Sequence, residues 1–201
     1  YWVTDRLMRP VRRAVAARAA AWGLDADADG GWSPLLQVAQ CPAALDFPRA
    51  AQPPAFRYVG PWRAPVTPVA LPQDDGRPLV YCSLGSLQGG REALFAAMSA
   101  ACADRGARAV VAHGGRLSEA AVRGLPGDPL VAAFWPQPAV LPHCAAALLH
   151  GGFNTVLDAL AAGVPMAVAP IAFEQPATAA RIAHHGAGVM VRGRPDRAKL
   201  A

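Results

Sequence analysis

The run His150-Gly-Gly-Phe-Asn-Thr-Val-Leu-Asp158 has the residue types and spacing of a site for a nucleotide diphosphate. Paired glycines let the backbone turn sharply and approach a ligand closely. A helix that begins at Asn154 would direct its free N–H groups and positive dipole end toward that ligand. His150 could donate to a diphosphate oxygen, and Thr155 adds a hydroxyl. Asp158 shares a helix face with Asn154, and its carboxylate could accept the hydroxyls of a ribose.

Three shorter runs could complete this site. They are Leu84-Gly-Ser86, Phe134-Trp-Pro-Gln137 and Phe173-Glu-Gln-Pro176. Ser86 could reach a phosphate, the aromatic residues of the second run could stack on a base, and Glu174 with Gln175 could hold sugar hydroxyls. Each of the four runs, taken alone, also has an ordinary structural explanation. In the run His150–Asp158, for example, Asn154 could cap a helix and His150 could be a core histidine. All four runs follow predicted strands, which these ordinary explanations do not require.

Apolar segments alternate with helical patterns from residue 79 onward. The predicted strands span residues 79–84, 107–112, 129–134, 145–149, 164–169 and 188–191. Three helices are predicted in this part of the chain. The first begins near Gly89 and ends at Gly106, and the other two span 154–162 and 175–184. The strands lack polar alternation, which favours a parallel sheet buried on both faces. We therefore predict an α/β fold, a Rossmann-like parallel sheet with helices on both faces, that binds its ligand beyond the carboxyl ends of the strands.

The first part of the chain has a different pattern. Residues 1–22 carry apolar side chains at helical spacing and predict a helix, with Pro10 near its start or at a kink. A loop is predicted at 25–31 and short strands at 35–40 and 56–59. Proline is frequent from 46 to 78, which indicates a surface connector. The predicted divisions are an N-terminal part (1–61), a connector (62–77) and the α/β domain (78–201).

Composition excludes several classes of protein. Of the 201 residues 53% are hydrophobic and 16% charged, so a large core is expected and disorder is not. The net charge is +5, and its basic residues crowd near the start, at Arg6, Arg9, Arg12, Arg13 and Arg18. No nucleic-acid-binding module accompanies them, so we expect no nucleic-acid partner. They indicate a solvated helix face or, as an alternative, peripheral contact with an anionic membrane.

The cysteines and the hydropathy pattern indicate a reducing compartment. Cys41, Cys82, Cys102 and Cys144 are too far apart in sequence to suggest a metal site, and they read as small buried residues. The sequence shows no signal-peptide pattern and no apolar run of the roughly 18–20 residues that cross a bilayer. We therefore expect a cytoplasmic protein that could touch the inner membrane face, and no metal or cofactor.

The motifs between Trp135 and Gln175 resemble a known signature. Trp-Pro-Gln, His-x-Gly-x-Asn-Thr-x-x-Asp, Gly-Val-Pro and Glu-Gln follow one another in the order found in family-1 UDP-glycosyltransferases, which have the two-domain GT-B fold. This resemblance implies a donor-binding role for Ser86, Phe134, Trp135, Gln137, His150, Gly152, Asn154, Thr155, Asp158, Glu174 and Gln175. Plant members usually have Trp where Phe134 stands, so base stacking could be weaker or shift to Trp135. Asp158 stands where the family usually has Glu, and Glu174 stands where it usually has Asp.

Within that family the chain resembles bacterial zeaxanthin glucosyltransferases. The matching runs are Asp46-Phe-Pro-Arg49, Tyr58-Val-Gly-Pro61, Asn154-Thr-Val-Leu-Asp-Ala-Leu160 and Gln175-Pro-Ala-Thr-Ala-Ala-Arg181. The resemblance implies inverting transfer of a hexosyl group, glucose by preference, from a UDP-sugar to a hydroxyl of a small lipophilic acceptor such as a carotenoid. Macrolide or other natural-product glycosyltransferases share much of the signature and remain an alternative.

The resemblance also implies that parts of the enzyme lie outside this sequence. Residues 1–61 resemble the tail of an N-terminal acceptor domain, which would carry the catalytic base, and residues 78–201 resemble a donor domain without its closing helices. We therefore assign no catalytic residue here, and we expect these residues alone to bind UDP weakly without turnover.

Other classes fit less well. Gly85-Ser-Leu-Gln-Gly-Gly90 has the glycines of a P-loop, but Arg91-Glu92 stands where Lys and Ser or Thr are needed. The same loop lacks the glycine pattern of a dinucleotide-binding dehydrogenase. A non-catalytic nucleotide-sugar-binding subunit or partner remains an alternative of a different class.

Overall fold

The computed structural model describes residues 2–24, 33–71, 75–193 and 195–201. The chain forms two compact units, one of Tyr1–Ala43 with Pro48–Gly60 and a larger one of Ala44–Phe47 with Pro61–Ala201. All residues of the predicted donor site belong to the larger unit. The division into residues 1–61, 62–77 and 78–201 stays a prediction.

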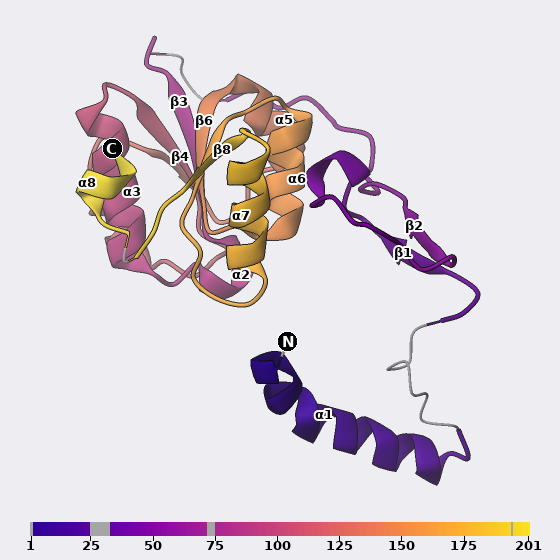
Figure 1. Ribbon diagram of the computed structural model, residues 1–201. Coiled ribbons are helices and arrows are strands. Elements are labelled where there is room, and N and C mark those ends of the chain that lie inside the picture. Colours follow the sequence, from indigo (N-terminus) through magenta and orange to yellow (C-terminus); the bar gives the residue numbers. More distant parts are fainter. Residues whose placement is uncertain (1, 25–32, 72–74, 194) are drawn as a thin grey trace. The chain divides into compact units, whose positions relative to one another are not determined.

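A six-stranded sheet in the order β5-β4-β3-β6-β7-β8 forms the centre of the larger unit (Figure 1). The strands are β3 (Leu79–Ser83), β4 (Arg108–Ala112), β5 (Leu130–Ala132), β6 (Cys144–Leu149), β7 (Met166–Val168) and β8 (Gly188–Met190). Every neighbouring pair is parallel, which confirms the predicted fold class. Five of the strands are shorter than predicted, because apolar residues continue beyond the paired residues into the adjoining loops, whereas β6 begins one residue before its predicted start.

The direction of strand addition reverses between β3 and β6. Strands β3, β4 and β5 extend the sheet toward one edge, and β6, β7 and β8 extend it toward the other. Figure 1 shows α3 (Glu92–Asp104) and α8 (Arg197–Leu200) on one face of the sheet and α6 (Phe153–Ala161) and α7 (Gln175–His184) on the other. The loops that follow β3 and β6 therefore diverge, which opens a crevice at the carboxyl edge of the sheet.

The long helices agree with the sequence prediction, and the short ones do not. Helices α6 and α7 confirm the predictions to within one residue, whereas α3 begins after a separate short helix. Between residues 79 and 201, the unpredicted helices are α2 (Gly85–Gln88), α4 (Glu119–Arg123), α5 (Gln137–Val140), the 3-10 turn Leu141–His143 and α8. Helices of four or five residues hold barely more than one turn, so no helical period can be recognised in them.

The core lies on both faces of the sheet. Strand β4 is buried at all five positions, as expected of a central strand covered by helices on both sides. On α3 the side chains of Phe95, Met98 and Cys102 are buried against the sheet, while Leu94 is only partly buried. This packing holds the carboxyl ends of β3 and β6 in fixed positions.

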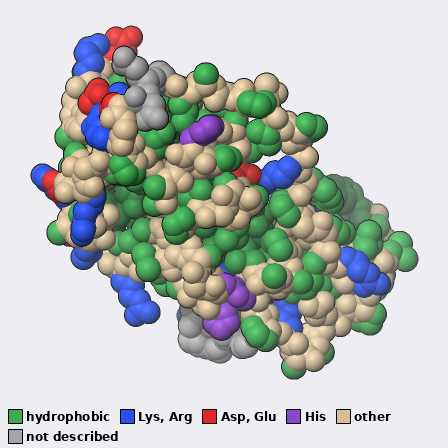
Figure 2. All heavy atoms as spheres, turned by 90° about the horizontal axis from the view of Figure 1, so that it is seen from above, with side chains coloured by type: hydrophobic (Ala, Val, Ile, Leu, Met, Phe, Trp, Pro, Cys, Tyr) green, Lys and Arg blue, Asp and Glu red, His purple; other side chains and the backbone are tan. Residues whose placement is uncertain are grey.

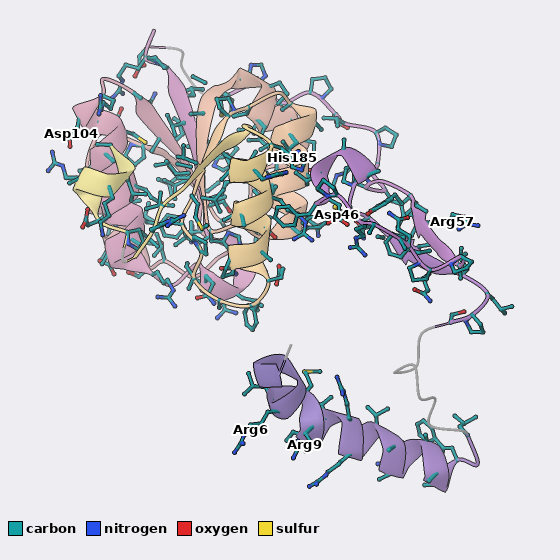
Figure 3. The ribbon with its side chains drawn as sticks, viewed as in Figure 1. Arg6, Arg9, Asp46, Arg57, Asp104 and His185 are labelled. Atoms are coloured by element: carbon teal, nitrogen blue, oxygen red, sulfur yellow. The ribbon has the colours of Figure 1, made fainter. Side chains whose placement is uncertain are left out.

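A short segment before the connector docks on α7. Asp46, which follows the 3-10 turn Ala43–Leu45, is buried and forms an ion pair with Arg181 of α7 at 2.9 Å. The backbone carbonyl of Asp46 also lies 3.3 Å from Nε2 of His185, and Figure 3 shows these two residues facing each other. Phe47 packs edge-on against His184, with ring centroids 5.2 Å apart. The segment Ala44–Phe47 is thereby fixed to the larger unit.

The smaller unit contains α1 (Trp2–Ala21) and the parallel pair β1 (Gln37–Ala39) and β2 (Phe56–Tyr58). The predicted helix and strands are confirmed, but Pro10 lies inside α1 and not near its start. Its missing N–H removes one bond of the helix without ending it. The loop predicted at 25–31 lies outside the described residues.

The surface charge and the helices of the described residues relate to the predictions about nucleic-acid and membrane partners. On the face that Figure 2 shows, Lys and Arg side chains are spread among hydrophobic and uncharged atoms without one continuous basic patch. None of the helices in the described ranges combines the length and apolar character needed to cross a bilayer. Peripheral membrane contact stays a prediction.

Candidate functional site

A cavity of about 570 Å³ lies at the carboxyl edge of the sheet, in the crevice between β3 and β6. Ten of the predicted donor-binding residues line it: Ser86, Phe134, Trp135, Gln137, His150, Gly152, Asn154, Thr155, Glu174 and Gln175. They come from the loops after β3, β5, β6 and β7, so the structure brings together residues that lie far apart in sequence. Asp158, the eleventh, does not line the cavity.

Glycine is required at positions 85 and 152 because the imidazole ring of His150 fills the space that a larger side chain would need there. A Cβ atom on Gly152 would lie 2.5 Å from Nε2 of His150, and one on Gly85 would lie 2.9 Å from the same atom. Gly151 has φ +93°, and a Cβ there would also meet Val168 Cγ1 at 2.9 Å. The paired glycines of the sequence motif therefore allow the turn and leave room for the ring.

His150 is buried, and its burial favours the neutral imidazole. Burial lowers the pKa of His150, and the opposing effects of the Ser83 carbonyl and the Glu174 carboxylate are smaller. Nδ1 of His150 lies 3.3 Å from the carbonyl oxygen of Ser83. A carbonyl only accepts, so this contact selects the tautomer with hydrogen on Nδ1. Nε2 faces the glycine turns and is then free to accept a proton.

Helix α6 begins at the cavity without a side-chain cap. Its N-cap is Gly152, with φ −60° and ψ 127°, and no side chain bonds the first turn. The alternative interpretation of Asn154 as the N-cap is therefore wrong, because the helix starts one residue earlier, at Phe153. Gly152, Phe153, Asn154 and Thr155 all line the cavity. Its first-turn N–H groups can therefore donate to an anion there.

The two aromatic residues after β5 have different environments. The side chain of Phe134 is 71% exposed. The indole N–H of Trp135 donates to the carbonyl of Val111 at 3.1 Å, which ties this ring to β4. Of these two rings, Phe134 is therefore the one that is available to a ligand, and Trp135 holds the loop in place.

Asp158 lies directly behind the cavity wall. It is buried, and its Oδ2 accepts from Nε2 of Gln137 at 3.4 Å. Its Oδ1 forms an ion pair with Nε of Arg63 at 2.8 Å. Burial raises the pKa of Asp158, and the Arg63 charge opposes that rise. The four-residue spacing predicted that Asp158 shares a helix face with Asn154. Only the first turn of that face lines the cavity, so Asn154 reaches it and Asp158 does not.

The loop after β7 is held by Gln175 itself. Oε1 of this buried residue accepts from the backbone N–H groups of Ile171 and Ala172, at 2.8 and 2.9 Å. Phe173 adopts φ 57°, a conformation that is uncommon for a side chain of its size and is often found at functional sites. Glu174 is exposed on the rim, so it is the carboxylate of this loop that a ligand can reach first.

Sequence reasoning did not identify Tyr81, Ser83 and Arg63, each of which contacts a predicted site residue. Tyr81 is fully buried, and its hydroxyl donates to Oε1 of Gln137 at 3.2 Å. Ser83 supplies the carbonyl that faces His150. Arg63 reaches the site from the proline-rich segment, 91 residues before Asn154. Tyr81 and Ser83 are ordinary strand residues and Arg63 belongs to no motif, so the sequence carries no signal for them.

Comparisons with known proteins agree with this geometry. Residues 65–195 match the family described as UDP-glucoronosyl and UDP-glucosyl transferase. The chain is 40% identical over 190 residues to the zeaxanthin glucosyltransferase of Pseudescherichia vulneris, covering 92% of this chain and 46% of that protein. It is 32% identical to the 4'-demethylrebeccamycin synthase of Lentzea aerocolonigenes, covering 96% of this chain and 48% of that protein. The chain thus spans about half the length of the curated relatives it matches.

Solved structures show the same fold. The kitacinnamycin glycosyltransferase superposes with a TM-score of 0.77 and 25% identity, over 98% of this chain and 57% of that one. The calicheamicin glycosyltransferase CalG4 superposes with a TM-score of 0.76 and 26% identity, over 100% and 54%.

Proposed function

This chain belongs to the UDP-glucoronosyl and UDP-glucosyl transferase family, and from that premise we propose that it supplies the donor site of a UDP-dependent hexosyltransferase. The reaction would transfer a hexosyl group, glucose by preference, to a hydroxyl of a small lipophilic acceptor. One observation carries this proposal: the loops after β3, β5, β6 and β7 place ten predicted donor-binding residues on one cavity.

The cavity can accommodate a UDP-sugar in one orientation. The diphosphate would lie at the uncapped start of α6, between His150 and Ser86. The exposed ring of Phe134 would stack on the uracil, and the ribose would lie against Gln137, with Asp158 behind it. The sugar would then reach Glu174 and Gln175 at the opposite rim.

The proposed chemistry is a direct displacement with inversion. The acceptor oxygen bonds to the anomeric carbon as the bond from that carbon to the β-phosphate oxygen breaks, and UDP leaves with the electron pair. The acceptor proton passes to a base that we do not assign to any residue of this chain. Fixed N–H dipoles at the start of α6, with His150 and Ser86, would stabilise the charge on the departing phosphate.

We propose that donor binding needs no metal. Of the described residues that line the cavity, Glu174 alone carries a carboxylate, and it lies at the sugar end. Magnesium in nucleotide sites is usually bound by carboxylates together with phosphate oxygens. Apart from the imidazole of His150, the groups near the expected diphosphate are N–H and O–H donors, which suit the phosphate itself.

The relatives support a carotenoid acceptor over other natural products. Two zeaxanthin glucosyltransferases, from Pseudescherichia vulneris and Pantoea ananas, are 40% and 39% identical to this chain. The demethyllactenocin mycarosyltransferase of Streptomyces fradiae is 38% identical over a shorter stretch, so a polyketide acceptor is the second candidate. A carotenoid acceptor would fit a cytoplasmic enzyme that touches the membrane peripherally, which we include in the proposal.

Changing Glu174 to Gln tests the assignment of the sugar end. We expect UDP-glucose to bind about tenfold more weakly, because a charged acceptor for sugar hydroxyls becomes neutral. UDP, which lacks the sugar, should bind as before. Titration calorimetry of the chain with both ligands measures this difference, with Glu119→Gln on the exposed helix α4 as the matched control. An equal loss for UDP and UDP-glucose would contradict the assignment.

A further inference from the structure

Arg63 joins the proline-rich segment to the helix that begins at the cavity. Its Nε pairs with Oδ1 of Asp158 at 2.8 Å, and its Nη2 donates to the backbone carbonyl of Asn154 at 3.1 Å. The two contacts are one helical turn apart on α6. The Asp158 side chain is 8% exposed and that of Arg63 is 30% exposed, so the carboxylate is shielded from water while the guanidinium remains partly accessible.

The same carboxylate ends a chain of partly buried hydrogen bonds. Tyr81 donates to Oε1 of Gln137 at 3.2 Å, and Nε2 of Gln137 donates to Oδ2 of Asp158 at 3.4 Å. Gln137 lines the cavity, and Asp158 lies behind it. The contact to Gln137 is long, whereas the contact to Arg63 is short. A ligand hydroxyl can therefore replace Gln137 at Oδ2 while Arg63 keeps Oδ1 in place.

Arg63 also favours the charged form of this carboxylate. Burial alone raises the pKa of Asp158, and the guanidinium acts in the opposite direction. In the described part of the chain, the titratable groups that face Asp158 are Arg63 and the phenol of Tyr81. An ionised carboxylate offers only acceptor sites, which is what two neighbouring hydroxyls require.

We infer that Arg63 is a positioning residue for the donor nucleotide, which holds Asp158 in the orientation that accepts the ribose hydroxyls. Arg63 does not touch the nucleotide and acts through Asp158. The proline-rich segment then becomes part of the donor site and does more than link two parts of the chain. This inference rests on the proposed function, because it requires a ribose at the Gln137 end of the cavity.

Arg63→Met tests the inference, since it keeps an unbranched apolar stem and removes the guanidinium. We expect UDP to bind about tenfold more weakly, a loss of about 1.4 kcal/mol. The affinity for 2′,3′-dideoxy-UDP should be the same in the variant and the unaltered chain, because that ligand has no hydroxyls for Asp158. Arg63→Lys should recover part of the UDP affinity. Arg123→Met, at an exposed ion pair with Glu119, is the matched control and should bind both ligands normally.

The outcomes separate the inference from the proposed function. If the unaltered chain binds neither ligand, the proposed function fails. If it binds UDP and Arg63→Met binds UDP equally well, the inference is wrong. Equal losses for UDP and the dideoxy analogue would show that Arg63 only stabilises the fold, which also overturns the inference. If Arg63→Met does not fold, Arg63→Lys carries the same comparison, with a smaller loss expected for UDP alone.

Discussion

Changing Asp158 to Asn is expected to weaken UDP binding about 100-fold without lowering the stability of the free chain. The loss follows because hydrogen bonds to a charged acceptor contribute roughly 1.5–3 kcal/mol each, and two ribose hydroxyls are involved. Stability should not fall because burial raises the pKa of Asp158 above 3.8 in the folded chain. A carboxyl group with a raised pKa in the folded chain stabilises that chain when the pH is below 3.8. This stabilisation is lost as the pH rises through the pKa of the folded chain. At pH 7 the buried charge is therefore a cost that Asn removes.

Titration calorimetry with UDP and thermal unfolding of the free chain at pH 7 measure the two effects. Asp104→Asn is the matched control, because this carboxylate also pairs with an arginine, Arg197, but lies outside the cavity. It should leave UDP affinity unchanged. Undiminished UDP binding by Asp158→Asn would remove Asp158 from the site. A marked fall in its melting temperature would show that the ion pair with Arg63 outweighs the cost of burial.

Binding of UDP-glucose is expected to be accompanied by uptake of a proton at His150. In the free chain burial lowers the pKa of His150, and the Ser83 carbonyl holds the hydrogen on Nδ1. Nε2 can donate to a phosphate oxygen only after it gains a proton, and the diphosphate charge favours that form. The bound state thus holds more protons than the free state, so affinity should rise as pH falls from about 8 to about 6.5.

Calorimetry in buffers of different ionisation enthalpy measures the proton uptake directly. UDP-glucose is the suitable ligand, because its diphosphate diester does not itself titrate in this range. His150→Asn keeps a donor for Ser83 but cannot be protonated, so it should abolish the uptake and reduce affinity on the order of 100-fold. His143→Asn, outside the cavity, should change neither quantity. Uptake that persists in His150→Asn would assign the proton to another group.

The sequence predicted those parts of the fold that depend on long local patterns. The apolar runs of β3, β4 and β6 and the amphipathic periods of α6 and α7 are set by side chains close together in the chain. Helices α2, α4 and α5 are too short to show a period. The carboxyl-edge rule for parallel sheets then placed the four motif loops together without any knowledge of long-range contacts.

The roles of individual site residues were less accessible to sequence reasoning. The sugar contact of Gln175 stays a prediction, and the structure adds a role that the motif did not indicate, because its Oε1 holds the backbone of its own loop. Trp135 was the alternative residue for stacking on the base, but its indole N–H donates a hydrogen bond to the carbonyl of Val111. Both facts depend on partners that only the folded chain brings near. The contact of Arg63 with Asn154 spans 91 positions and belongs to no motif, so no local pattern could reveal it.

A nucleotide diphosphate should bind where the glycine turn leads into α6. Amide NMR spectra of the ¹⁵N-labelled chain, recorded during a titration with UDP, locate this binding residue by residue. We expect the largest shift changes at Gly151, Gly152, Phe153 and Asn154, with smaller changes at Gly85 and Ser86. Shift changes confined to the amino edge of the sheet near Arg77 and Leu79, or no changes at saturating UDP, would contradict this binding position.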